Sequence, residues 1–252
     1  MISFAAAAAI AVAAFLSAFV TGVFGMAGGQ ILLAVLLYYL PVSAAMTVFS
    51  GLMFTAGLWR AILWRQHVAW PIAWRCMCGL VAGYMLMLLV QFVPSKPLIY
   101  LGLGLTPILG DLAPKRFAPD VSKPGLAAVC GFIIMVLQIS VGAAGNVLDI
   151  FFQASPLGRH AIVATKAVVQ TASQTMRFVY FGAIALAEGQ HAEWWLFVIF
   201  ALLTFAGGSA STRLLESLSD RSFRYWTRRV IWGFSVLYVA RGLWLLWTGQ
   251  YA

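Results

Sequence analysis

The chain has 252 residues, of which 63% are hydrophobic and only 9% are charged, and its formal net charge is +9. Charged residues make up about a quarter of an ordinary soluble domain, so this composition excludes a water-soluble protein and predicts a polytopic α-helical membrane protein. We interpret the positive charge as basic residues retained on the cytoplasmic side, and we expect no nucleic-acid partner.

The first predicted element is an uncharged apolar region from Phe4 to Leu40, which glycine interrupts near its middle. The interruption reads Gly25-Met26-Ala27-Gly28-Gly29 and is followed by Gln30. Each glycine costs a helix interior roughly 1 kcal/mol relative to alanine, so we expect the helix to break here. A broken backbone at membrane depth is tolerated only where protein or a water-filled cavity satisfies its polar groups. The interruption therefore predicts a lined cavity.

Three further apolar segments complete the first half, at Ala44 to Trp64, Cys76 to Val93 and Leu98 to Leu109. The basic, tryptophan-rich loop between the first two is typical of a cytoplasmic membrane interface. The polar, proline-rich stretch 111–124 is the predicted linker between a first transmembrane repeat (1–110) and a second (125–252).

The second half contains segments of the same kinds. Gly125 to Phe152 is again broken by glycine, at Gly142-Ala143-Ala144-Gly145-Asn146. Apolar spans are predicted at Ala161 to Ala187, Trp194 to Ser211 and Val230 to Trp247, with a basic loop from Arg213 to Arg229 before the last.

The two halves repeat at a constant offset of 117 residues. This offset carries Gly25 to Gly142, Gly28 to Gly145, Ala44 to Ala161 and Arg60 to Arg177.

Equivalent loops of the two halves differ in charge, which predicts that the repeats are inverted. The loop 65–75 is basic, whereas its counterpart 188–193 has no Lys or Arg; the turn 94–97 has one Lys, whereas 213–229 has five Arg. Inversion needs an odd number of crossings in each half, so each glycine-broken segment should re-enter as a hairpin beside three transmembrane helices. We expect a bacterial inner-membrane type of protein with both termini outside.

These features resemble the TauE/SafE family of sulfite exporters, also called the four-toluene-sulfonate uptake permease family, over nearly the whole chain. Each half of a member opens with a G-x-G-G-G type segment followed by an apolar stretch and a proline, here Pro41 and Pro156. The resemblance implies a secondary transporter of sulfite, sulfonates, thiosulfate or related small anions. The chain departs from the pattern at Ala27, Ala144 and Asn146, which leaves the exact substrate open.

The candidate substrate site combines both glycine breaks with a polar stripe on the Ala161–Ala187 segment. We interpret the breaks as midplane turns with free N–H groups for an anion, the alternative being close helix packing through small residues. The stripe suits an anion pathway because arginine binds oxyanions well, the alternative being a polar seam between helices; Gln138 is a weaker candidate. The predicted substrate-binding residues are Gly25, Gly28, Gly29, Gln30, Gly142, Gly145, Asn146, Gln170, Gln174 and Arg177.

Asp149 and Lys166 are the candidate coupling or gating pair. An acid at membrane depth costs about 2.5–3.5 kcal/mol on insertion scales and is a functional candidate by default. Lys166, at the start of the following helix, is its nearest plausible partner. A proton-coupling or gating switch and a static ion pair both remain open.

Nothing in the sequence predicts an enzyme, a cofactor or a metal site, since no nucleophile–base pair, metal-ligand spacing or phosphate-binding loop is present. The expected partners are a small anionic substrate and membrane lipid, and a homo-oligomer is left open. An anion channel and a non-transporting membrane assembly or sensor subunit are the alternative functions.

Overall fold

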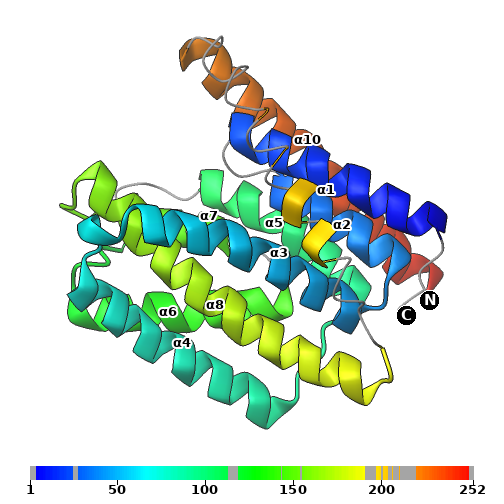
Figure 1. Ribbon diagram of the computed structural model, residues 1–252, viewed down its shortest axis with the longest axis horizontal. Helices are drawn as coiled ribbons and strands as arrows, with labels where there is room; N and C mark the ends of the chain where they lie inside the picture. The colour runs from blue at the N-terminus through cyan, green and yellow to red at the C-terminus, as the bar shows by residue number, and fades with distance from the viewer. Residues whose placement is uncertain are drawn as a thin grey trace.

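The computed structural model describes residues 4–24, 28–112, 119–142, 144–153, 155–190 and 220–249, and also 197–199, 201–203, 206 and 210. All the regular elements in this part of the chain are helices (Figure 1), which confirms the predicted all-α class.

Among the described residues, three helices are long and apolar enough to cross a membrane. They are α3 (Val42–Leu63), α4 (Trp70–Val90) and the Arg229–Thr248 part of α10 (Asp220–Thr248). Shorter apolar helices are found within α1 (Phe4–Phe24), α2 (Gly28–Tyr39) and α6 (Pro124–Ser140).

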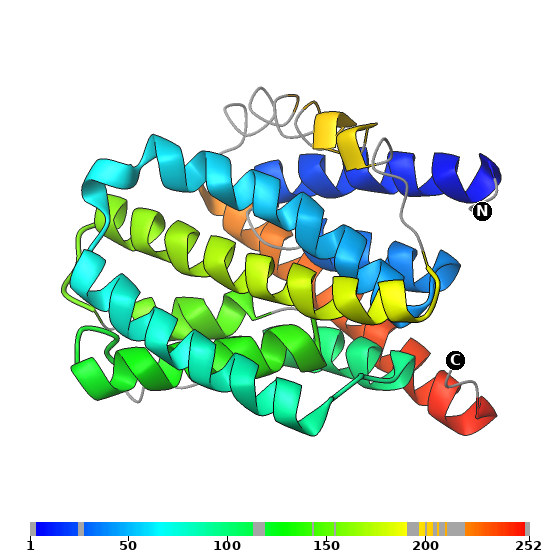
Figure 2. The ribbon, with the colours of Figure 1, turned by 60° about the horizontal axis from the view of Figure 1, so that its bottom comes forward.

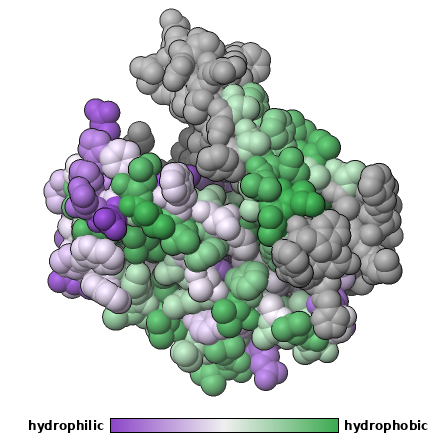
Figure 3. All heavy atoms as spheres, viewed as in Figure 1, coloured by the Kyte–Doolittle hydropathy of each residue, from purple (hydrophilic) through white to green (hydrophobic). Residues whose placement is uncertain are grey.

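Large apolar side chains on these helices face outward. Leu89 on α4 is 84% exposed and Trp247 on α10 is 87% exposed. Hydrophobic residues cover much of the face in Figure 3, while hydrophilic residues gather at the left, where α3 leads into α4. A water-soluble monomer rarely exposes so much contiguous apolar surface, so the chain is a membrane protein.

The remaining elements are η1 (Arg65–His67), α5 (Lys96–Leu112), α7 (Gly145–Gln153) and α8 (Arg159–Ala187). The prediction of a loop over Arg213–Arg229 is wrong for its second part, because α10 already begins at Asp220. No glycine or proline lies between Asp220 and Trp232, so the sequence contains nothing that would stop the helix there.

The chain turns back on itself at both glycine breaks. Ser17 Oγ in α1 donates a hydrogen bond to the Gly28 carbonyl (2.6 Å), and α1 and α2 lie side by side (Figure 1). In the second half, the backbone N–H of Val121, just before α6, donates to the carbonyl of Phe151 near the end of α7 (3.2 Å). Each pair therefore forms a helical hairpin; its re-entry into a membrane stays a prediction.

The helix boundaries follow the offset seen in the sequence. The helices that follow the breaks, α2 and α7, begin at Gly28 and Gly145, which are 117 positions apart. The next helices, α3 and α8, begin at Val42 and Arg159, and these are also 117 positions apart.

Helices α3 and α8 run antiparallel along the centre of the molecule (Figure 2). At one end Ser43 Oγ donates to Glu188 Oε2 (2.5 Å), and at the other the backbone N–H of Ala69, just after α3, donates to Thr165 Oγ1 (2.9 Å). The pair therefore contacts over its whole length and forms the axis on which the site is built.

Two other helix pairs flank this axis. Helix α5 packs against α10, where the rings of Tyr100 and Tyr238 lie 6.2 Å apart. Helix α4 crosses α6 so closely that a Cβ atom at Gly79 would collide with the backbone carbonyl of Ala128. Small residues at such crossings let two membrane helices approach and gain dispersion contacts.

We predict that Gly79→Ala destabilises the protein by about 1–3 kcal/mol, because α4 and α6 must separate to admit the methyl group. Thermal unfolding of the purified protein in detergent measures this. The control is Gly233→Ala in α10, where a Cβ atom meets nothing within 4 Å. Equal unfolding temperatures for the two variants would contradict the close crossing.

Candidate functional site

Arg177 lies in the middle of α8, and its side chain is 0% exposed. It is the largest fully buried side chain in the described part of the chain. A buried guanidinium is tolerated only where hydrogen-bond acceptors or an opposite charge replace the water it has lost, so its surroundings define the site.

Two helices from different halves hold the guanidinium. Its Nε donates to Ser50 Oγ on α3 (2.7 Å), and Nη1 donates to Gln138 Oε1 on α6 (2.7 Å). The ring of Phe49 on α3 covers one face, with its centroid 4.8 Å from Cζ. All of these groups are neutral, so they orient the guanidinium without compensating its charge.

The second glycine break supplies the remaining acceptor. Gly142 follows the end of α6 with φ +83°, a left-handed conformation that glycine adopts at little cost. Its carbonyl accepts from Arg177 Nη1 at 2.6 Å, and the Gln138 carbonyl accepts from the same nitrogen at 3.3 Å. Arg177 therefore satisfies carbonyls at the C-terminal end of α6, where the helix dipole is negative.

Two polar side-chain atoms of α8, on residues three positions apart, have no hydrogen-bond partner among the described groups. Arg177 Nη2 and Gln174 Oε1 are both buried and have no hydrogen-bond partner among the described residues. The acidic side chains that the structure describes are engaged elsewhere: Asp149 with Lys166, Glu188 with Ser43, and Asp120 with Ser122. Within the described residues, Arg177 is thus a buried cation that no carboxylate neutralises.

Gln170 of the stripe also lies beside the second break. A Cβ atom at Gly145 would lie 3.6 Å from Nε2 of Gln170, and one at Gly110 would lie 3.6 Å from Cβ of Asn146. The start of α7 thus packs between α8 and α5. The structure brings the second break together with Gln170 and Arg177.

Lys166 and Asp149 form a salt bridge between α8 and α7, and their side chains are 24% and 21% exposed. This contact confirms Lys166 as the partner of Asp149, while a coupling or gating role of the pair stays a prediction. Arg60, the counterpart of Arg177 in the first half, lies exposed near the end of α3.

The first break contributes less directly. Gly25 lies outside the described residues, and the Gly28 carbonyl is already bonded to Ser17. A Cβ atom at Gly29 would lie 3.6 Å from the ring of Phe49, the same ring that covers Arg177, and Gln30 is buried. Among the described residues, the first break thus reaches Arg177 through an aromatic ring and not through a hydrogen bond.

Sequence reasoning missed two residues of the cluster, Ser50 and Phe49. Serine and phenylalanine are ordinary residues of apolar helices, and neither stands near a glycine break in the sequence. Gln138 gave a weak signal as an amide close to the second break. Only the packing of α3 and α6 against α8 shows that these side chains meet Arg177.

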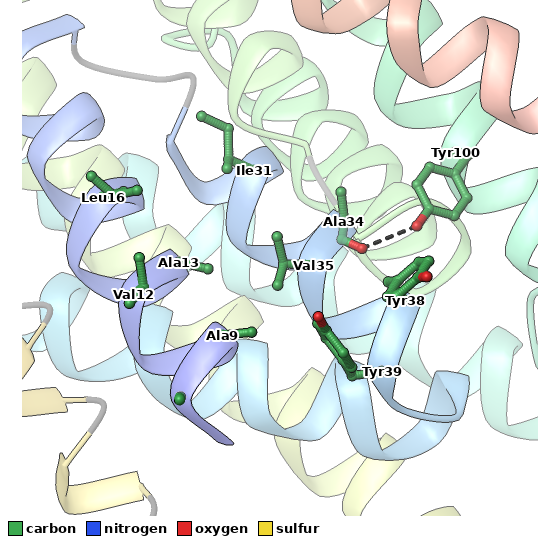
Figure 4. Close-up of a pocket in the computed structure, with 11 residues that line it drawn as sticks. Ala9, Val12, Ala13, Leu16, Ile31, Ala34, Val35, Tyr38, Tyr39 and Tyr100 are labelled. Carbon is green, nitrogen blue, oxygen red and sulfur yellow. Dashed lines mark hydrogen bonds between the residues drawn. The ribbon is translucent and has the colours of Figure 1, made fainter. Parts of the chain in front are cut away.

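A groove of about 710 Å³ lies between α1 and α2, and Figure 4 shows the residues that line it. Its walls are apolar apart from tyrosines at one end, where Tyr100 Oη donates to the Ala34 carbonyl (3.0 Å). No charged residue lines it, so it offers nothing that would retain a small anion. In the described part of the chain, no three metal-ligating side chains come together either.

Comparison with known proteins gives one clear relation. A family model described as "Sulfite exporter TauE/SafE" matches residues 10–238, a span that includes both glycine breaks and Arg177. No curated protein and no solved structure matches the chain.

We predict that Gly142→Ala destabilises the protein more than Gly189→Ala. Both glycines have positive φ, so each substitution adds roughly 1–2 kcal/mol of backbone strain. A methyl group at Gly142 would also meet Leu33 and Met46, at a further cost of about 1–3 kcal/mol, whereas at Gly189 it meets nothing within 4 Å. Thermal unfolding in detergent measures the difference, and equal shifts would refute the packed turn.

Proposed function

This chain belongs to the TauE/SafE family of sulfite exporters, and from that premise we propose that it is a secondary transporter of small sulfur-containing anions. Sulfite, sulfonates and thiosulfate are the substrate class, and no enzymatic step is part of the function. The substrate binds at Arg177, where α3, α6 and α8 meet. The observation that carries this proposal is the buried, unneutralised guanidinium.

The chemistry of Arg177 fits an oxyanion. A guanidinium offers several N–H donors in a fixed plane, which suits two oxygens of one anion. Its Nε and Nη1 are held by Ser50, Gln138 and Gly142, while Nη2 stays without a partner. If Arg177 served only to cap the C-terminal end of α6, we would expect all its donors to bond to acceptors of the protein. The unused donor Nη2 and the uncompensated positive charge therefore favour binding of an anionic ligand.

The arrangement of the halves supports alternating access. Helices α3 and α8 start 117 residues apart and are therefore counterparts, yet they pack antiparallel. Counterparts related by a two-fold axis in the membrane plane run in opposite directions, as expected of inverted repeats. The bond between Ser50 and Arg177 lies across the two halves, so rocking of one half against the other would expose the anion to either side.

The Asp149–Lys166 pair is the proposed gate. It joins α7, the second arm of the broken hairpin, to α8, which carries Arg177. Release of this pair would free α7 to move away from the stripe. Placement in a bacterial inner membrane with both termini outside completes the proposal.

We predict that Arg177→Met lowers saturable sulfite flux into proteoliposomes roughly tenfold or more, because a charge-assisted contact to the anion is removed. The matched control is Arg60→Met, the counterpart in the first half, which is exposed and should transport normally. Thermal unfolding of both variants verifies folding.

Several outcomes would overturn this assignment. Unchanged sulfite flux in the folded Arg177→Met variant would remove Arg177 from the site. Single-channel current steps from the wild-type protein would favour a channel. The absence of flux for every sulfur oxyanion tested would favour an assembly or sensor subunit.

We predict that Asp149→Asn lowers stability by about 1–3 kcal/mol, because Lys166 is left half-buried and unpaired. The double variant Asp149→Asn/Lys166→Met should regain the stability but not the wild-type flux, because it lacks the salt bridge that would form and break in the transport cycle. Unfolding temperatures and proteoliposome flux measure both. Full recovery of flux in the double variant would show that the pair is static.

A further inference from the structure

We infer that the anion received by Arg177 is monovalent and itself carries a hydrogen-bond donor, so that sulfur(IV) is carried as hydrogen sulfite and not as the sulfite dianion. This inference rests on the proposed function and specifies the chemical form of its substrate. It follows from the charge and from the unsatisfied acceptor of one small cluster.

The charge of the site is a single positive one. Arg177 is fully buried, and Ser50, Gln138, Gly142 and Phe49 around it are neutral. A monoanion would bring the cluster to zero net charge. A dianion would leave one uncompensated negative charge in a buried place, where the penalty is several kcal/mol per ion.

Helix α8 itself brings no second cation to this cluster that could neutralise a dianion. Lys166 is on the same helix, but it is eleven residues from Arg177, or roughly 16 Å along α8. Its charge is already paired with Asp149. The site therefore selects by charge as well as by shape.

The unsatisfied acceptor is Gln174 Oε1, three residues before Arg177 and so on the same face of α8. The neighbouring hydroxyls cannot serve it, because Ser50 Oγ donates to the Met46 carbonyl and Ser173 Oγ donates to the Gln170 carbonyl. A ligand with one O–H group satisfies this acceptor while its anionic oxygens accept from Arg177 Nη2. Leaving a buried acceptor unpaired would instead carry a desolvation penalty.

Hydrogen sulfite meets both conditions, since it has one negative charge and one proton. The sulfite and thiosulfate dianions meet neither, so this inference removes thiosulfate from the proposed substrate class and makes sulfonates, which lack the O–H group, weaker ligands than hydrogen sulfite. A proton would then cross the membrane on the substrate itself, so movement of a proton with sulfur(IV) would need no titrating carboxylate on the protein.

The test is the pH dependence of sulfite flux into proteoliposomes that have the same pH inside and outside, with the flux of protein-free vesicles subtracted. The half-saturating concentration is measured at several pH values around neutrality. We expect the half-saturating concentration to stay constant with pH when it is calculated for hydrogen sulfite alone. When it is calculated for total sulfite, we expect it to rise about tenfold per pH unit where the dianion predominates. Sulfate, a dianion, should not compete.

A second arm tests the donor. Gln174→Met keeps the size of the side chain and removes the acceptor, and we expect it to raise the half-saturating concentration of hydrogen sulfite about fivefold with unchanged unfolding temperature. Because methanesulfonate is a monoanion without an O–H group, its competition with sulfite should not weaken in this variant.

The outcomes distinguish failure of the hydrogen sulfite inference from failure of the proposed transport function. A half-saturating concentration that is constant as total sulfite, or effective competition by sulfate, would overturn the monoanion while leaving sulfite transport intact. Wild-type affinity in Gln174→Met would overturn the donor requirement. No saturable flux of sulfite or any other sulfur oxyanion would overturn the proposed function itself.

Discussion

The structure depends on how one buried guanidinium is satisfied. Arg177 bonds to α3 through Ser50, to α6 through Gln138, and to the turn after α6 through Gly142. These three contacts join both halves of the chain around one buried positive charge. Since the contacts are neutral, they fix the orientation of the guanidinium without compensating its charge, and in our proposal an anionic ligand does so.

The two glycine breaks make different contacts with the Arg177 cluster. The second break needs Gly142 because its φ is positive and because Leu33 and Met46 leave no room for a side chain. It frees the carbonyls that Arg177 then satisfies, so the break and the arginine depend on each other. The described part of the first break instead packs Gly29 against Phe49 and positions the aromatic wall. Among the described residues, only the second break thus contacts Arg177 through a hydrogen bond.

Selectivity follows from the same arrangement. A transporter of small anions must bind its substrate strongly enough to select it and weakly enough to release it. In the proposed site, one cation, one unsatisfied amide oxygen and a neutral wall would hold a monoanion less strongly than a cluster of basic residues, which favours its release. The apolar groove between α1 and α2 is lined by no charged group, so we do not propose it as the anion site.

The sequence by itself determined the helical membrane class, the positions of both breaks, the offset of 117 residues and the polar stripe that contains Arg177. These features are local or periodic, so composition, glycine content and spacing reveal them. Tertiary structure alone decided which stripe residue is central, since only the packing of α3 against α8 brings Ser50, 127 positions away, to Arg177. It also placed Lys166 in a salt bridge with Asp149 and separated the first break from Arg177 by the ring of Phe49. A hydrogen bond across the two halves depends on the directions of side chains in the folded protein, and no one-dimensional pattern records those directions.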